Sequence, residues 1–178
     1  MFTPRWFGAV LAVALAAGVA NAGDGPSLGL PASETEIAAA DIDIGPDGDG
    51  LPPGGGTPAQ GAKVYAATCL ACHGEGGRGG PHDALVGGIG TLGGEGKPVK
   101  TAGSFWPYAP TLFDYIRRAM PLNAPLSLSD SEVYAVVAFI LSLNGLIAAD
   151  AEMNARDLPR VRMPNRDGFV SFYPTPVK

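Results

Sequence analysis

The chain has 178 residues, and 17 acidic and 12 basic side chains give it a formal net charge of −5. This charge excludes the basic surface that nucleic-acid binding requires, so we expect no nucleic-acid partner. The length suits one modest domain, and two cysteines with two histidines are too few for a zinc site at ligand spacing.

Residues 1–22 have the pattern of a secretory signal peptide. Arg5 supplies positive charge, residues 8–20 form an apolar run, and Ala20-Asn21-Ala22 fits an A-x-A cleavage site. The run is shorter than the roughly 20 apolar residues that span a bilayer. We therefore expect a periplasmic protein with no membrane span after cleavage. An uncleaved N-terminal membrane segment is the alternative.

Residues 23–56 form an acidic segment that is rich in proline and glycine. Turn sequences interrupt it, and it has little helical or strand periodicity. Two interpretations remain open: a flexible linker, or an extended arm that lies over the domain through Ile42, Ile44 and Leu51.

The first predicted helix runs from Thr57 to Ala71. Thr57-Pro58-Ala59-Gln60 combines a capping box with proline at the first helical position. Gly61 and Tyr65 lie one turn apart on one face, where glycine allows another helix to approach closely.

The end of this helix carries the sequence Cys69-Leu70-Ala71-Cys72-His73, which reads C-x-x-C-H, the attachment signature of a c-type haem. Two thiols on one helical turn can each add to a vinyl group of the same porphyrin, and His73 then supplies a nitrogen ligand to the iron. A disulfide or a thioredoxin-like pair is the alternative, but it calls for a preceding strand and a βαβ pattern, and neither is visible. We therefore predict one covalent haem c on Cys69, Cys72 and His73.

A glycine-rich loop is predicted from Gly74 to Gly103. Backbone without Cβ atoms can adopt positive φ and press against the edge of a haem. The second histidine, His82, lies in this loop, and we interpret it as an exposed loop residue because neither composition nor spacing makes it a ligand.

The second helix is predicted from about Pro110 to Ala119. Its apolar face is expected to consist of Leu112, Tyr115, Ile116 and Ala119. The helix ends at Met120-Pro121 because a residue before proline is pushed out of the α region. Met120 would then be extended, with its thioether free to point at iron. Met163, which also precedes a proline, is the competing candidate ligand.

The last helix is predicted from Ser129 to Leu143, with a capping box at Ser129 and Glu132 and a stop at Asn144-Gly145. Its buried stripe should consist of Val133, Val136, Val137, Ile140 and Leu141. Residues 146–178 form an irregular tail with four arginines: Arg156, Arg160, Arg162 and Arg166. A solvated tail and a tail that docks a partner or contacts the haem propionates both remain open.

The order of these elements resembles a class I cytochrome c over about residues 57–145. The resemblance implies an all-α fold of three main helices around one covalent haem, with the first and last helices crossing at Gly61 and Tyr65. It implies His73 as the proximal iron ligand and a later methionine, matched by Met120, as the distal one. Outside these residues we expect an extended arm at residues 23–56 and a tail at residues 146–178 that packs on the domain.

A closer resemblance involves residues 41–54, 105–121 and 163–169. These segments are similar to the cytochrome subunits of sulfite and sulfane dehydrogenases, the SoxD-like proteins. The resemblance implies a molybdenum dehydrogenase subunit as partner. It also implies that both the arm and the tail are ordered. Several SoxD proteins carry two haem motifs, whereas this chain has one.

The predicted function is that of a periplasmic monohaem cytochrome c that accepts electrons from a molybdenum sulfite or sulfane dehydrogenase. A downstream cytochrome or oxidase would receive the electrons. We expect no catalysis by this chain alone, since the sequence offers no general base or nucleophile. The alternatives are a general electron shuttle to a terminal oxidase, a haem peroxidase with an open iron position, and a sensor in which a ligand displaces Met120.

Overall fold

The computed structural model describes residues 28–170 and 172, so the predicted signal peptide at residues 1–22 lies outside the described residues. The chain divides into two units, one up to Ala40 and one from Asp41 onward. The first unit contains the helix α1 (Glu34–Ala40), which buries none of its residues. No helix was predicted here, although Ser33 and Glu36 form a capping box in which the Glu36 N–H donates to the Ser33 hydroxyl.

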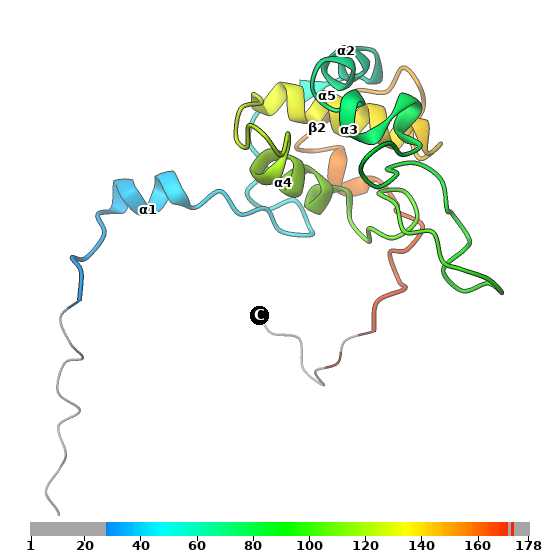
Figure 1. Cartoon of the computed structure of the whole chain (residues 1–178). Coiled ribbons are helices and arrows are strands. Elements are labelled where there is room, and N and C mark those ends of the chain that lie inside the picture. Colours follow the sequence, from blue (N-terminus) through cyan, green and yellow to red (C-terminus); the bar gives the residue numbers. More distant parts are fainter. Residues whose placement is uncertain (1–27, 171, 173–178) are drawn as a thin grey trace, which may run out of the picture. The chain divides into compact units, whose positions relative to one another are not determined.

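The second unit is mainly helical (Figure 1). Its elements in chain order are β1 (Gly55–Gly56), α2 (Pro58–Thr68), α3 (Leu70–His73), the 3-10 helix η1 (Glu75–Gly77), α4 (Ala109–Ala119), α5 (Asp130–Leu143), β2 (Met153–Asn154) and the 3-10 helix η2 (Leu158–Arg160). The two short strands pair antiparallel, with Gly55 opposite Asn154 and Gly56 opposite Met153. This architecture confirms the predicted all-α class I cytochrome c fold.

Helix α2 begins at the predicted capping box but is shorter than predicted. The Gln60 N–H donates to the Thr57 hydroxyl, and the Gln60 side chain accepts the Thr57 N–H. The helix ends at Thr68, because Cys69 adopts φ −116° and ψ −33°, and α3 then begins at Leu70. The haem motif therefore occupies a separate helical turn instead of the last turn of α2.

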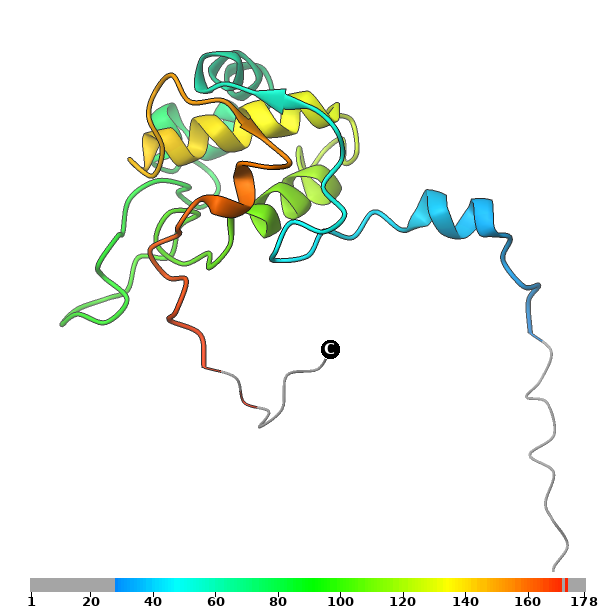
Figure 2. The same cartoon turned by 180° about the vertical axis from the view of Figure 1, so that it is seen from behind.

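Helices α2 and α5 cross in close contact, as both views of the molecule show (Figures 1 and 2). A Cβ atom at Gly61 would lie 1.9 Å from the carbonyl oxygen of Ala135, so only glycine fits. One turn later the rings of Tyr65 and Phe139 pack with centroids 5.3 Å apart. The crossing predicted at Gly61 and Tyr65 is confirmed.

Helix α4 packs on α5 through a face that differs in part from the predicted one. Leu112, Phe113 and Ile116 are buried, and the Phe113 ring lies 4.4 Å from that of Tyr134. Tyr115, expected on this face, is 46% exposed and contacts Trp106 edge to face. The prediction was wrong there because the stripe that meets α5 runs through Phe113, next to Leu112, instead of through Tyr115.

The segments that precede and follow the three main helices in the sequence contribute residues to the same core. From the N-terminal side, Ile44 is 6% exposed, and the carbonyl of Pro52 accepts a hydrogen bond of 2.9 Å from the Tyr134 hydroxyl. From the C-terminal side the core includes four buried residues of the tail: Met153, Leu158, Val161 and Met163. The η2 segment contacts α4, and β2 contacts α5 (Figure 2). Within residues 28–170 and 172, no helix has the length and apolar character to cross a membrane.

Candidate haem site

The haem motif presents both cysteine thiols from one short turn. Cys69 is half-buried at the junction of α2 and α3, and Cys72 is exposed; both are free thiols. The His73 N–H donates to the Cys69 carbonyl at 3.0 Å, which closes the turn. Burial raises the pKa of the Cys69 thiol, whose sulfur lies 3.4 Å from the Thr68 hydroxyl. Two free thiols on one turn fit the covalent attachment of a single porphyrin.

The ring of His73 is oriented by a main-chain oxygen. Its Nδ1 lies 2.8 Å from the carbonyl oxygen of Asp83. A carbonyl only accepts hydrogen bonds, so Nδ1 carries the proton and Nε2 keeps its lone pair for a metal. This arrangement fits a haem ligand. Sequence reasoning missed Asp83, because a backbone carbonyl leaves no signal in residue identity.

The loop after the motif folds back on α3. The Tyr65 hydroxyl donates to the Gly74 carbonyl at 2.8 Å, and the His82 N–H donates to the Cys72 carbonyl at 3.0 Å. Gly74 has φ +73°, and a Cβ atom there would lie 2.1 Å from the Gly79 carbonyl oxygen. The His82 side chain is exposed, and its ring centroid is 6.3 Å from that of His73.

Asn144 holds the far part of this loop. Its amide nitrogen donates to the carbonyls of Leu85 and Ile140, and its amide oxygen accepts the Gly87 N–H at 3.0 Å. A Cβ atom at Gly103 would lie 2.2 Å from this oxygen, so the chain passes close beside the amide. From the sequence, Asn144 was predicted only to end the last helix, because asparagine is also common at helix C-termini.

Met120 has the backbone conformation predicted for it. It caps α4 with φ −122° and ψ 145°, and its N–H donates to the Ile116 carbonyl. Its side chain is half-buried and packs against the core that Cys69 also contacts. Met163, the competing candidate, is 1% exposed and lies within that core.

Arginines near the site are engaged in local contacts. Arg117 pairs with Asp130 at 3.0 Å, and Arg118 pairs with both Asp43 and Asp114, which raise the pKa of its guanidinium. The four tail arginines contact acidic or aromatic side chains: Arg156 and Arg160 meet Asp157, Arg162 meets Asp167, and Arg166 lies over the Tyr108 ring. These contacts offset much of the positive charge that a basic docking face would need.

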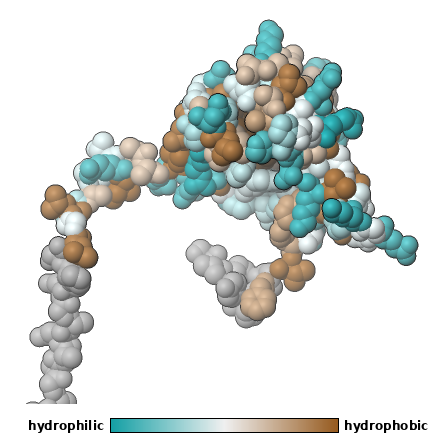
Figure 3. All heavy atoms as spheres, viewed as in Figure 1, coloured by the Kyte–Doolittle hydropathy of each residue, from teal (hydrophilic) through white to brown (hydrophobic). Residues whose placement is uncertain are grey.

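Apolar side chains are exposed on the motif turn and on the segment after Met120. Leu70 is 40% exposed, Leu122 is 66% and Leu126 is 63%. On the face shown in Figure 3, hydrophobic and hydrophilic residues are interspersed over the molecule. Such side chains offer contact surface to a porphyrin or to a partner protein.

The fold and the motif together define a c-type cytochrome of class I. The family model described as cytochrome C oxidase, cbb3-type, subunit III matches residues 56–140. The crystal structure of the sulfane dehydrogenase SoxCD from Paracoccus pantotrophus contains a similar chain, with 41% sequence identity and a TM-score of 0.75. The match covers 84% of this chain and 72% of that one. No curated protein sequence matches the chain significantly.

The chain therefore belongs to the class I c-type cytochromes, as a SoxD-like member, and carries covalent haem c. Electron transfer is the activity of this class.

Proposed function

We propose that this protein is a periplasmic monohaem cytochrome that accepts electrons from a molybdenum dehydrogenase acting on sulfite or sulfane sulfur. It passes them to a downstream cytochrome or oxidase. The observation that carries the proposal is the C-x-x-C-H turn with His73 held by the Asp83 carbonyl, in a chain 41% identical to part of a sulfane dehydrogenase. Residues 1–22 act as the export signal in this proposal.

The axial ligands in this proposal are His73 and Met120. His73 binds through Nε2, since Nδ1 is engaged with Asp83. Met120 has an accessible, half-buried thioether on an extended backbone, whereas Met163 is enclosed by protein and has no free face for a porphyrin. Thioether ligation favours the ferrous state and raises the reduction potential.

The residues of the chain then act by holding the cofactor, without forming a bond to substrate. Cys69 and Cys72 fix it covalently, Asp83 orients the proximal ring, and the loop held by Asn144 contacts the motif turn through the His82 N–H. When bound, the haem supplies a one-electron couple between ferrous and ferric iron. This chain resembles the SoxD-like cytochrome subunits of dehydrogenases. We therefore assign the substrate chemistry to the partner subunit.

Purification of the protein from its native periplasm tests the assignment of the partner. We expect it to co-purify with a molybdenum-containing subunit at a fixed ratio, and molybdenum and haem should elute together on size exclusion. A matched sample of a periplasmic shuttle cytochrome serves as the control. If the protein elutes alone and no molybdenum elutes with its haem, the general shuttle replaces the dedicated acceptor.

A further inference from the structure

The segment that carries Met120 connects the end of α4 to the start of α5. Its residues from Leu122 to Ser127 are exposed, and Leu126 has φ +62°, a conformation that is strained for a leucine. A segment with so little buried surface is held mainly at its two ends. The position of the Met120 thioether therefore depends on what fixes those ends.

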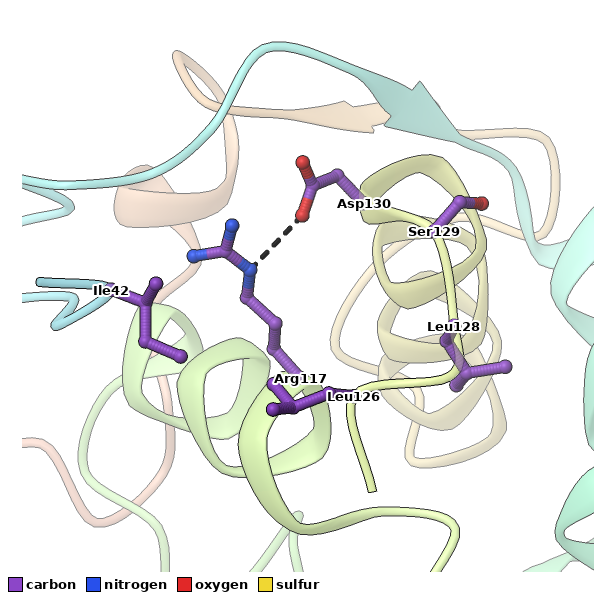
Figure 4. A pocket seen from close by; sticks show the side chains of 6 residues that line it. All are labelled: Ile42, Arg117, Leu126, Leu128, Ser129 and Asp130. Carbon is purple, nitrogen blue, oxygen red and sulfur yellow. Dashed lines mark ion pairs between the residues drawn. The ribbon is translucent and has the colours of Figure 1, made fainter. Parts of the chain in front are cut away.

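An ion pair joins the two ends of this segment. Arg117 lies three residues before Met120 in the last turn of α4, and Asp130 is the first residue of α5. The Nε atom of Arg117 lies 3.0 Å from Oδ1 of Asp130, and Figure 4 shows the two side chains meeting between the helices. A cation at a helix C-terminus and an anion at a helix N-terminus are each favourable, so both helices support the pair.

The surroundings of the pair strengthen it. Arg117 and Asp130 line a pocket of about 330 Å³ together with Ser129 and three apolar residues, Ile42, Leu126 and Leu128. The side chains of the pair are 21% and 35% exposed, respectively. Apolar neighbours and partial burial lower the effective dielectric, so this pair is worth more than a fully exposed one.

We propose that the Arg117–Asp130 ion pair positions Met120 for iron ligation by closing the segment that carries it. The inference rests on the proposed assignment of Met120 as distal ligand. A thioether is a neutral and weak ligand, so a competitor displaces it when its segment is free to swing away. Arg117 and Asp130 are thus positioning residues that set how readily the sixth iron position opens.

Imidazole titration of the ferric holoprotein tests this role, with loss of the weak long-wavelength sulfur-to-iron absorption band as the readout. Arg117→Gln and Asp130→Asn should each lower the half-saturating imidazole concentration by about fivefold, the upper end of what an ion pair at a protein surface supplies. The double variant should have the same half-saturating imidazole concentration as the single variants, because each single change already breaks the pair. Arg117→Lys should recover part of the effect.

Arg118→Gln is the matched control, because Arg118 pairs with Asp43 and Asp114 and neither pair closes the segment. The proposal is overturned if Arg117→Gln and Asp130→Asn shift the titration no more than Arg118→Gln does, or if their effects simply add. Met120→Ala separates this failure from failure of the ligand assignment. If the band persists in Met120→Ala, Met120 is not the ligand and the positioning role falls with it.

Discussion

The side chains of Met120 and Met163 differ chiefly in their solvent exposure. Met120 keeps a free face, whereas Met163 is 1% exposed within the core. Met120→Ala should remove the long-wavelength band of the ferric protein and lower the reduction potential, because the iron loses a ligand that favours its ferrous state. Absorption spectroscopy and redox titration measure both effects.

Met163→Ala is the matched variant with the opposite expectation. It should keep the band and lower the free energy of unfolding by about 2–5 kcal/mol, the cost of truncating a buried methionine. Loss of the band in Met163→Ala, with the band intact in Met120→Ala, would transfer the ligand role to Met163.

At the same scale, sequence reasoning succeeded where residue identity fixes the chemistry. The haem motif and the extended backbone of Met120 follow from the spacing of two cysteines and from the proline at position 121. The orienting group at Asp83 could not be predicted, since every residue type offers the same carbonyl. Asn144 escaped prediction because its loop partners lie more than 50 residues away in the sequence.

Among the elements, the crossing of α2 and α5 depends most on a single residue. Any side chain at Gly61 would meet the backbone of Ala135, which cannot move without shifting α5. Gly61→Leu should lower the free energy of unfolding by about 3 kcal/mol or more, at the upper end of the overpacking range. Urea denaturation followed by far-UV circular dichroism measures the change.

Ala59→Leu is the control for this prediction, because Ala59 is an exposed position of the same helix. It should leave the unfolding midpoint nearly unchanged. Equal destabilisation by Gly61→Leu and Ala59→Leu would contradict the close approach of the two helices.

The helices themselves were predictable where local signals agree. Capping boxes at Thr57 and Ser129 define the starts of α2 and α5 as the structure has them. The prediction failed at α1, where the Ser33–Glu36 box was overlooked, and at Tyr115, where packing decided between two possible faces. The strand β2 and η2 carry no strong local pattern, and the contacts of their residues with the core are non-local.

For the second unit as a whole, Tyr134 links α5 to the chain before β1. Its hydroxyl donates to the Pro52 carbonyl, and burial, followed by the nearby Asp130 carboxylate, raises its pKa to about 12 from an ordinary value of 10. A raised pKa means that folding favours the protonated phenol. The resulting stability is complete below about pH 10 and is lost as the pH rises towards 12.

Tyr134→Phe should therefore flatten the loss of stability between about pH 10 and about pH 12. At neutral pH it should cost about 1 kcal/mol or more, because the Pro52 carbonyl loses its donor. Chemical denaturation at a series of pH values measures both effects. Tyr115→Phe, at an exposed tyrosine, is the control, and an alkaline profile in Tyr134→Phe as steep as that of the wild type would refute the assignment.

Rapid-mixing reduction of the ferric haem decides whether this cytochrome takes electrons from a molybdenum dehydrogenase. The cognate dehydrogenase subunit, reduced by sulfite or by a sulfane substrate, is mixed with ferric protein while haem absorbance is followed. We predict that the haem is reduced within the turnover time of the dehydrogenase. Sulfite or the sulfane substrate without the dehydrogenase should not reduce it. If the reduced dehydrogenase leaves the haem ferric, while an unrelated donor such as ascorbate reduces it readily, the dehydrogenase is not the electron donor of this cytochrome.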